Sequence, residues 1–96
     1  MIRVADNRVE VSGPLTMSSG AALLVEGEAA LAAVAADVAE FDLGAVSEMD
    51  SSGLAVIFGW MRAARAAGKS FRIVNSPESL LSLAAVYGVA EFLPQH

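Results

Sequence analysis

A helical segment enclosed between two strand-like segments constrains the fold of this chain more than any other feature. Ser51–Ala67 is the strongest helix prediction, and Gly68 follows where a glycine commonly ends a helix. Asp37–Leu43 before it and Lys69–Val74 after it have the composition of strands. We interpret Asp37–Leu43 as an inner strand covered on both faces, and Gly44–Asp50 as a connecting loop. This succession predicts a crossover between parallel strands that packs on the sheet.

The N-terminal part predicts a β-hairpin. Apolar and polar residues alternate in Arg8–Leu15, which indicates a half-buried strand. Ile2–Val4 is its expected partner, and Asp6-Asn7 is typical of a turn. Gly13-Pro14 is expected to end the pairing.

A second helix is expected over Thr16–Ala33, capped by Thr16 or Ser18. Gly20 and Gly27 lie inside it, and each is expected to weaken the helix by about 1 kcal/mol relative to alanine. Leu23, Leu24, Gly27 and Leu31 share one face of this helix.

The C-terminal part predicts a third helix and a last apolar turn. Pro77 is expected at the first helical position, Gly88 at the end of the helix, and Val89–Leu93 in the turn. Tyr87, like Trp60 in the main helix, is interpreted as a core residue. The order β-β-α-β-α-β-α over residues 1–96 predicts a single α/β domain with a mostly parallel sheet.

Composition narrows the class of function. The net charge is -5 with only six Lys and Arg, which argues against nucleic acid and anionic membranes as partners. The sequence has no cysteine, no metal-ligand spacing and no glycine-rich phosphate loop, and its single histidine is the terminal His96. We therefore expect a non-catalytic protein-binding module without a cofactor or metal.

The apolar segments favour a soluble, cytoplasmic protein. The first residues do not resemble a signal peptide. The densest apolar stretch, Leu54–Met61, is far shorter than the ~20 residues of a membrane span. We expect no direct insertion into a membrane, and a partner that is another protein or a second copy in a homodimer.

The segment Met49–Leu54 carries the strongest functional signal. Asp50 or Ser51 is well placed to accept hydrogen bonds from the free N–H groups at the start of the main helix, and a helix cap alone is the alternative interpretation. Beyond the cap, Ser51, Ala55, Phe58 and Arg62 follow one ridge of the helix, on a different arc from the apolar stripe of Leu54, Ile57, Trp60, Met61 and Ala64. Aromatic and arginine side chains are enriched at binding hot spots. The predicted partner-binding residues are Asp50, Ser51, Ser52, Gly53, Ala55, Phe58 and Arg62.

These residues carry a family resemblance. Phe41-Asp42-Leu43, then Val46, then Met49–Leu54 resemble the STAS domain (sulfate transporter and anti-sigma factor antagonist). The resemblance covers nearly the whole chain and implies a short mixed β-sheet flanked by helices. It also implies a function in protein binding.

Two branches of the family fit the sequence. In the MlaB-type branch the domain binds the ATPase subunit of a bacterial phospholipid-transporting ABC system, and a hydroxyl residue at the Ser51 position lies in the interface. In the anti-sigma factor antagonists, the serine at this position is phosphorylated by a partner that is both serine kinase and anti-sigma factor. The resemblance thus implies an ATPase subunit or a kinase-like anti-sigma factor as partner.

The C-terminal sequence favours the MlaB-type branch, whereas the Ser51-Ser52 pair is the antagonist form. The favourable segments are Asn75–Leu80, Leu83-Ala84, Val86–Val89 and Phe92–Pro94. A phosphate on Ser51 would add about -1.5 to -2 charges at the positive end of the helix. We expect it to disrupt a flat apolar contact there without unfolding the domain.

Overall fold

One mixed sheet and the helices packed on it make up the described structure. The computed structural model describes residues 1–6 and 8–94, so Asn7 of the expected hairpin turn and the terminal His96 lie outside the described residues. Four strands are hydrogen-bonded in the order β1-β2-β3-β4 within this part of the chain. The elements are β1 (Ile2–Ala5), β2 (Arg8–Leu15), α1 (Met17–Ala33), β3 (Val38–Met49), α2 (Ser51–Ala66), β4 (Ser70–Val74), α3 (Glu78–Val86) and the 3-10 helix η1 (Ala90–Phe92).

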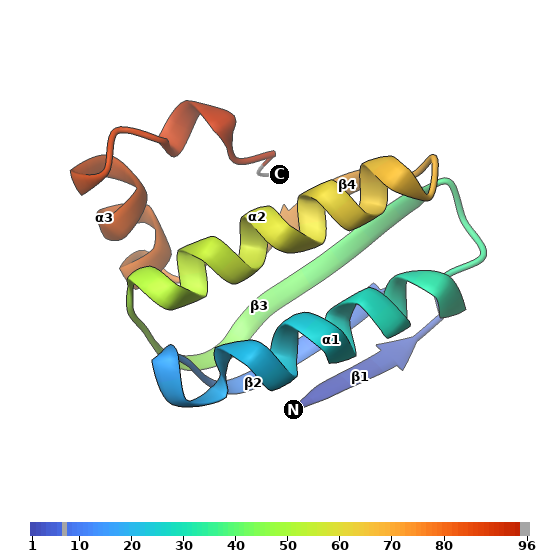
Figure 1. Ribbon diagram of the computed structural model, residues 1–96, viewed down its shortest axis with the longest axis horizontal. Helices are drawn as coiled ribbons and strands as arrows, with labels where there is room; N and C mark the ends of the chain where they lie inside the picture. The colour runs from blue at the N-terminus through green and yellow to red at the C-terminus, as the bar shows by residue number, and fades with distance from the viewer. Residues whose placement is uncertain (7, 95–96) are drawn as a thin grey trace.

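The strand directions confirm a mixed sheet. β1 is antiparallel to β2, as expected for a hairpin, whereas β2–β3 and β3–β4 are parallel pairs. Helices α1 and α2 lie side by side across one face of the sheet, and α3 lies beside the N-terminal end of α2 (Figure 1). The predicted α/β order and the helix-flanked sheet are confirmed.

Trp60 holds the two long helices and the sheet together. Its indole nitrogen donates to the carbonyl oxygens of Leu23 (3.2 Å) and Leu24 (3.3 Å) in α1. Its ring lies 4.9 Å from that of Phe41 on β3, measured between centroids. Gly27 lies against this ring so closely that an added Cβ would overlap the indole nitrogen. The expectation that Gly27 only weakens α1 was therefore incomplete, because the glycine is what allows the helix to approach Trp60.

β3 is longer than expected, and the pairing of β2 continues further than expected. Gly44–Asp50 was predicted as a loop, but β3 continues through most of it, to Met49. Gly13-Pro14 was expected to end the pairing, but β2 runs to Leu15, with Pro14 opposite Glu48. The pairing with β1 does stop near Val11, while the parallel pairing with β3 continues past two register shifts. Irregular register hides such a strand from a search for strict alternation.

The C-terminal helix begins one residue late, and one of its predicted core residues is exposed. Pro77 was expected at the first helical position, but its extended backbone (ψ 151°) makes it the N-cap, and α3 starts at Glu78. Tyr87 was interpreted as a core residue but is 56% exposed. Helix α3 ends at Val86, so helical spacing no longer determines where the Tyr87 side chain points. Trp60, by contrast, is fully buried as predicted.

The second face of the sheet carries a charged network. Glu40 accepts from Arg72 (3.2 Å) and is paired with Arg8 (3.5 Å), and Arg8 also lies 3.6 Å from Asp42. Arg3 pairs with Glu10 at the β1 edge. The interpretation of Asp37–Leu43 as a strand covered on both faces is wrong, because the helices cover one face and half-exposed ion pairs occupy the other.

Candidate functional site

The Asp50 carboxylate fixes the turn in front of α2. One oxygen accepts from the backbone N–H groups of Ser52 (2.8 Å) and Gly53 (3.4 Å), and the other accepts from the N–H of Met17 (3.0 Å). These bonds, the one from Met17 foremost, hold the pKa of the Asp50 carboxyl below its usual value, although desolvation acts in the opposite direction. Asp50 thus caps α2, as the sequence suggested, and also ties the start of α1 to it.

The three residues after Asp50 have different surroundings. Ser51 is exposed, Ser52 is half-buried and Gly53 is buried. A Cβ at Gly53 would overlap the carbonyl oxygen of Leu15. Of these three residues, Ser51 is therefore the one whose side chain is open to a partner. Gly53 allows α2 to start close against the ends of β2 and β3.

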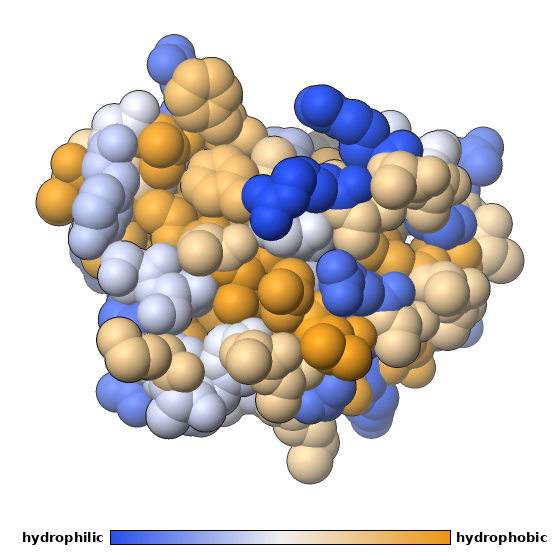
Figure 2. Space-filling view, in the orientation of Figure 1, coloured by the Kyte–Doolittle hydropathy of each residue, from blue (hydrophilic) through white to orange (hydrophobic). Residues whose placement is uncertain are grey.

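The outer side of α2 presents the remaining predicted residues together. Ala55 and Arg62 are exposed and Phe58 is half-buried. The helical spacing derived from the sequence thus separated the outer side from the buried side, with Met61 at the boundary and half-buried. Figure 2 shows this side of the molecule, where apolar colour extends over α1 and α2 and strongly hydrophilic side chains interrupt it.

A shallow apolar notch lies at the start of α2. Its volume is about 330 Å³, and its lining consists of Ser51, Leu54, Ala55, Phe58, Tyr87 and Val89. Tyr87 and Val89 were not predicted for the site. They flank Gly88, whose φ of +69° turns the chain at the end of α3. The glycine itself is the only local signal, because it marks the end of the helix, where the chain changes direction.

No group of three or more His, Cys, Asp or Glu side chains in residues 1–6 and 8–94 is positioned to hold a metal ion. None of the helices in the described part of the chain combines the length and apolar character that crossing a membrane requires.

A mixed four-stranded sheet, two long helices on one of its faces and a turn held by Asp50 at the start of the second helix define a STAS-type α/β domain. The family model described as "MlaB, STAS domain" matches residues 2–94, and the chain belongs to that family. STAS domains are in general non-catalytic modules for binding other proteins. No curated protein sequence matches this chain closely enough to count as a relative.

Solved structures share the fold across the family's branches. The anti-sigma factor antagonist SpoIIAA in its unphosphorylated form superposes with a TM-score of 0.72 at 16% identity, over 100% of this chain and 86% of that one. An anti-sigma factor antagonist from Mycobacterium paratuberculosis superposes with a TM-score of 0.72 at 22% identity, over 100% of this chain and 82% of that one. A sulfate transporter family protein from Wolinella succinogenes superposes with a TM-score of 0.71 at 13% identity, over 99% of this chain and 79% of that one. At these identities the likeness concerns the fold alone.

Proposed function

We propose that this protein is the accessory STAS subunit of a Mla-type phospholipid-transporting ABC system, and that it binds and regulates the ATPase subunit. The observation that carries the proposal is the notch formed by Ser51, Ala55 and Phe58 with Tyr87, which exposes aromatic and apolar surface beside a rigid turn. Membership of the MlaB-type family supports the choice of partner. Such a subunit would work in the cytoplasm, at the inner membrane only through its partner.

The residues of the site divide into contacts and supports. Ser51, Ala55 and Phe58 are the proposed contacts, with Arg62 at the edge. Asp50, Ser52 and Gly53 contribute by holding the backbone of the turn, since the Asp50 oxygens are engaged by N–H groups and Gly53 is buried. The sequence contains no phosphate-binding loop. Regulation would therefore arise by binding one conformation of the ATPase better than another.

Two substitutions test this surface. We expect Phe58→Ala to remove the apolar anchor, and Ser51→Asp to place a charge in the notch, so that both lose binding to the purified ATPase subunit. The matched control is Val25→Ala, which truncates a side chain that is 64% exposed on α1. Circular dichroism checks that all three variants stay folded. Wild-type affinity in both Phe58→Ala and Ser51→Asp would exclude the surface.

A second function is favoured by the exposure of Ser51. Its hydroxyl is the exposed first side chain of α2, where a kinase has access and where the helix dipole favours an added phosphate. The protein would then be an anti-sigma factor antagonist, switched by a kinase-like anti-sigma factor. Intact-mass measurement after incubation with that kinase and ATP separates the two functions. One added phosphate, absent in Ser51→Ala, supports the switch, and an unchanged mass contradicts it.

A further inference from the structure

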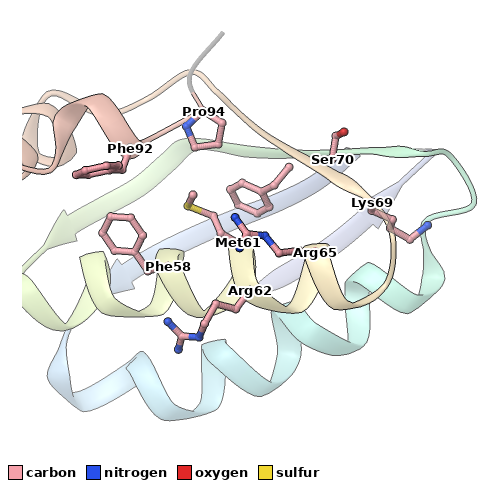
Figure 3. Close-up of a pocket in the computed structure, with 9 residues that line it drawn as sticks. Phe58, Met61, Arg62, Arg65, Lys69, Ser70, Phe92 and Pro94 are labelled. Carbon is pink, nitrogen blue, oxygen red and sulfur yellow. The ribbon is translucent and has the colours of Figure 1, made fainter.

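A second, larger groove continues from the notch along α2. It has a volume of about 720 Å³ and separates the C-terminal half of α2 from the chain around η1. Figure 3 shows Phe58 and Phe92 together at one end, Met61 and Arg65 in the middle, and Lys69 at the far end. Phe58 also lines the notch, so the two depressions form one continuous surface.

The groove collects positive charge, and no carboxylate of the described residues forms a salt bridge with it. Arg62, Arg65 and Lys69 all line it, in a chain whose net charge is -5. Within residues 1–6 and 8–94, every salt bridge belongs to the opposite face of the sheet. The Lys69 ammonium donates to the carbonyl oxygens of Val34 (2.7 Å) and Ala36 (3.0 Å), which satisfy its hydrogen bonds but do not neutralise its charge.

Structural roles account for part of this cluster. Arg65 lies in the last turn of α2, where a cation is favoured by the helix dipole. Lys69 holds the chain between α1 and β3 through its two carbonyl contacts. Neither role applies to Arg62, and neither explains Phe92, which is 59% exposed beside the cations. Arg65 points into the groove, whereas Arg62 leaves α2 on the side of α1 and lies at the rim (Figure 3). Apolar surface bordered by cations is complementary to an acidic ligand that carries an apolar group.

We infer that this groove receives an acidic segment of the partner protein, with an apolar side chain set between Phe58 and Phe92 and carboxylates opposite Arg62 and Arg65. The inference rests on the proposed function, since the groove continues the proposed ATPase contact. The groove is open to solvent along one side, so a small ligand would bury too little of its surface there. A nucleic acid would meet only three cations here, fewer than the roughly 6–10 phosphate contacts of a typical DNA-binding protein.

The first test measures the affinity of the ATPase subunit for Arg62→Gln/Arg65→Gln at low and at high salt. The control is Arg3→Gln, which removes a cation from the opposite face of the sheet. We expect the double variant to bind about tenfold more weakly at low salt and to lose most of the salt dependence of the wild type, and the control to match the wild type. Unchanged affinity and salt dependence in the double variant would overturn the inference while leaving the proposed function in place.

The second test identifies what lies in the groove. A photo-crosslinking residue, p-benzoylphenylalanine, replaces Phe92, and in the control it replaces Val25 on α1. We expect the Phe92 position to crosslink to an Asp- and Glu-rich peptide of the ATPase subunit, and the Val25 position not to do so. Crosslinking to a peptide without acidic residues, or none despite binding, would overturn the inference.

Two further outcomes concern a different occupant of the groove and the proposed function itself. Wild-type binding to phosphatidylglycerol vesicles that Arg62→Gln/Arg65→Gln abolishes, with ATPase binding unchanged, would assign the groove to a membrane surface and overturn the inference. If the unmodified protein does not bind the ATPase subunit at all, the proposed function fails and the inference fails with it.

Discussion

The two sides of α2 meet very different surroundings. On the inner side, Ile57, Trp60 and Ala64 are completely buried, and Gly27 of α1 leaves no room for one more carbon atom beside Trp60. On the outer side, Ser51 and Ala55 are exposed, with no close packing to restrict them. Close packing therefore restricts which residues the inner side tolerates, whereas the fold hardly restricts the choice of the outer residues. Residues on the outer side are better explained by binding than by stability.

The largest effect should follow from adding a methyl group on the inner side. In Gly27→Ala the new Cβ overlaps the Trp60 indole nitrogen, which two carbonyl hydrogen bonds hold in place. Overpacking of this kind costs about 1–3 kcal/mol or more. We expect a loss of about 3 kcal/mol in the free energy of unfolding, measured by urea denaturation.

Two companion variants test the cause of that loss. In Gly20→Ala the new Cβ lies 3.3 Å from Val56 Cγ2, a contact that small shifts relieve. The better helix propensity of alanine offsets it, so the change should stay within about 1 kcal/mol. Trp60→Phe removes the clashing nitrogen and should cost less in the Gly27→Ala background than in the wild type. Additive costs would show that the indole is not the obstacle.

A smaller effect on stability is expected at Asp50, the residue that caps α2. Its carboxyl has a lower pKa in the folded protein than the ~3.9 typical of an unfolded chain. It therefore stabilises the fold above that pH, and this contribution is lost as the pH falls through the folded-state pKa. Asp50→Asn should lower the melting temperature at pH 7, and the difference from the wild type should shrink below pH ~3.9. Equal differences at pH 7 and pH 3 would mean that the charge of Asp50 is unimportant.

Phe58 lies on the outer side of α2 but is half-buried, so its replacement should affect both stability and binding. Its ring is half-buried, so Phe58→Ala should cost about 1–2 kcal/mol of unfolding free energy, less than a fully buried aromatic. The same variant should show the largest loss of partner binding. Chemical denaturation and a binding titration on one preparation would separate the two effects, and a loss of stability above about 3 kcal/mol would place Phe58 in the core instead.

The smallest change in stability is expected at Ala55. Ala55→Arg adds a long polar side chain to an exposed helix position, which should alter the unfolding free energy by no more than about 0.5 kcal/mol. It also fills the notch, so binding of the ATPase subunit should fall sharply. Retained binding would move the contact away from the start of α2.

The comparison also explains what the sequence alone could predict. Strongly periodic or capped segments were predicted well: the order of elements, the position of α2 and its cap at Asp50 follow from residues that act locally. Gly44–Met49 was mistaken for a loop, because its strand character comes from pairing with β2 across register shifts. The role of Gly27 depends on Trp60, 33 positions later in the sequence, so no local pattern reveals it.

For the site, helical geometry grouped Ser51, Ala55, Phe58 and Arg62 correctly on the outer side of one helix. It could not supply Tyr87 and Val89, because their position beside α2 is decided by the turn at Gly88. Gly53 was predicted to bind a partner because it belongs to the Asp50–Gly53 turn, although the packing against Leu15 buries it. Spacing along one helix thus predicts the residues of that helix, but not what another segment adds.

The contact between Pro94 and β4 covers one open edge of the sheet. The Ile73 N–H on the outer edge of the sheet donates to the Pro94 carbonyl oxygen at 2.9 Å. An open strand edge is a template on which other molecules polymerise, and covering it is one way to prevent this. At the opposite edge, β1 is only four residues long. Pro94 thus covers part of the β4 edge, and the shortness of β1 limits pairing at the other edge.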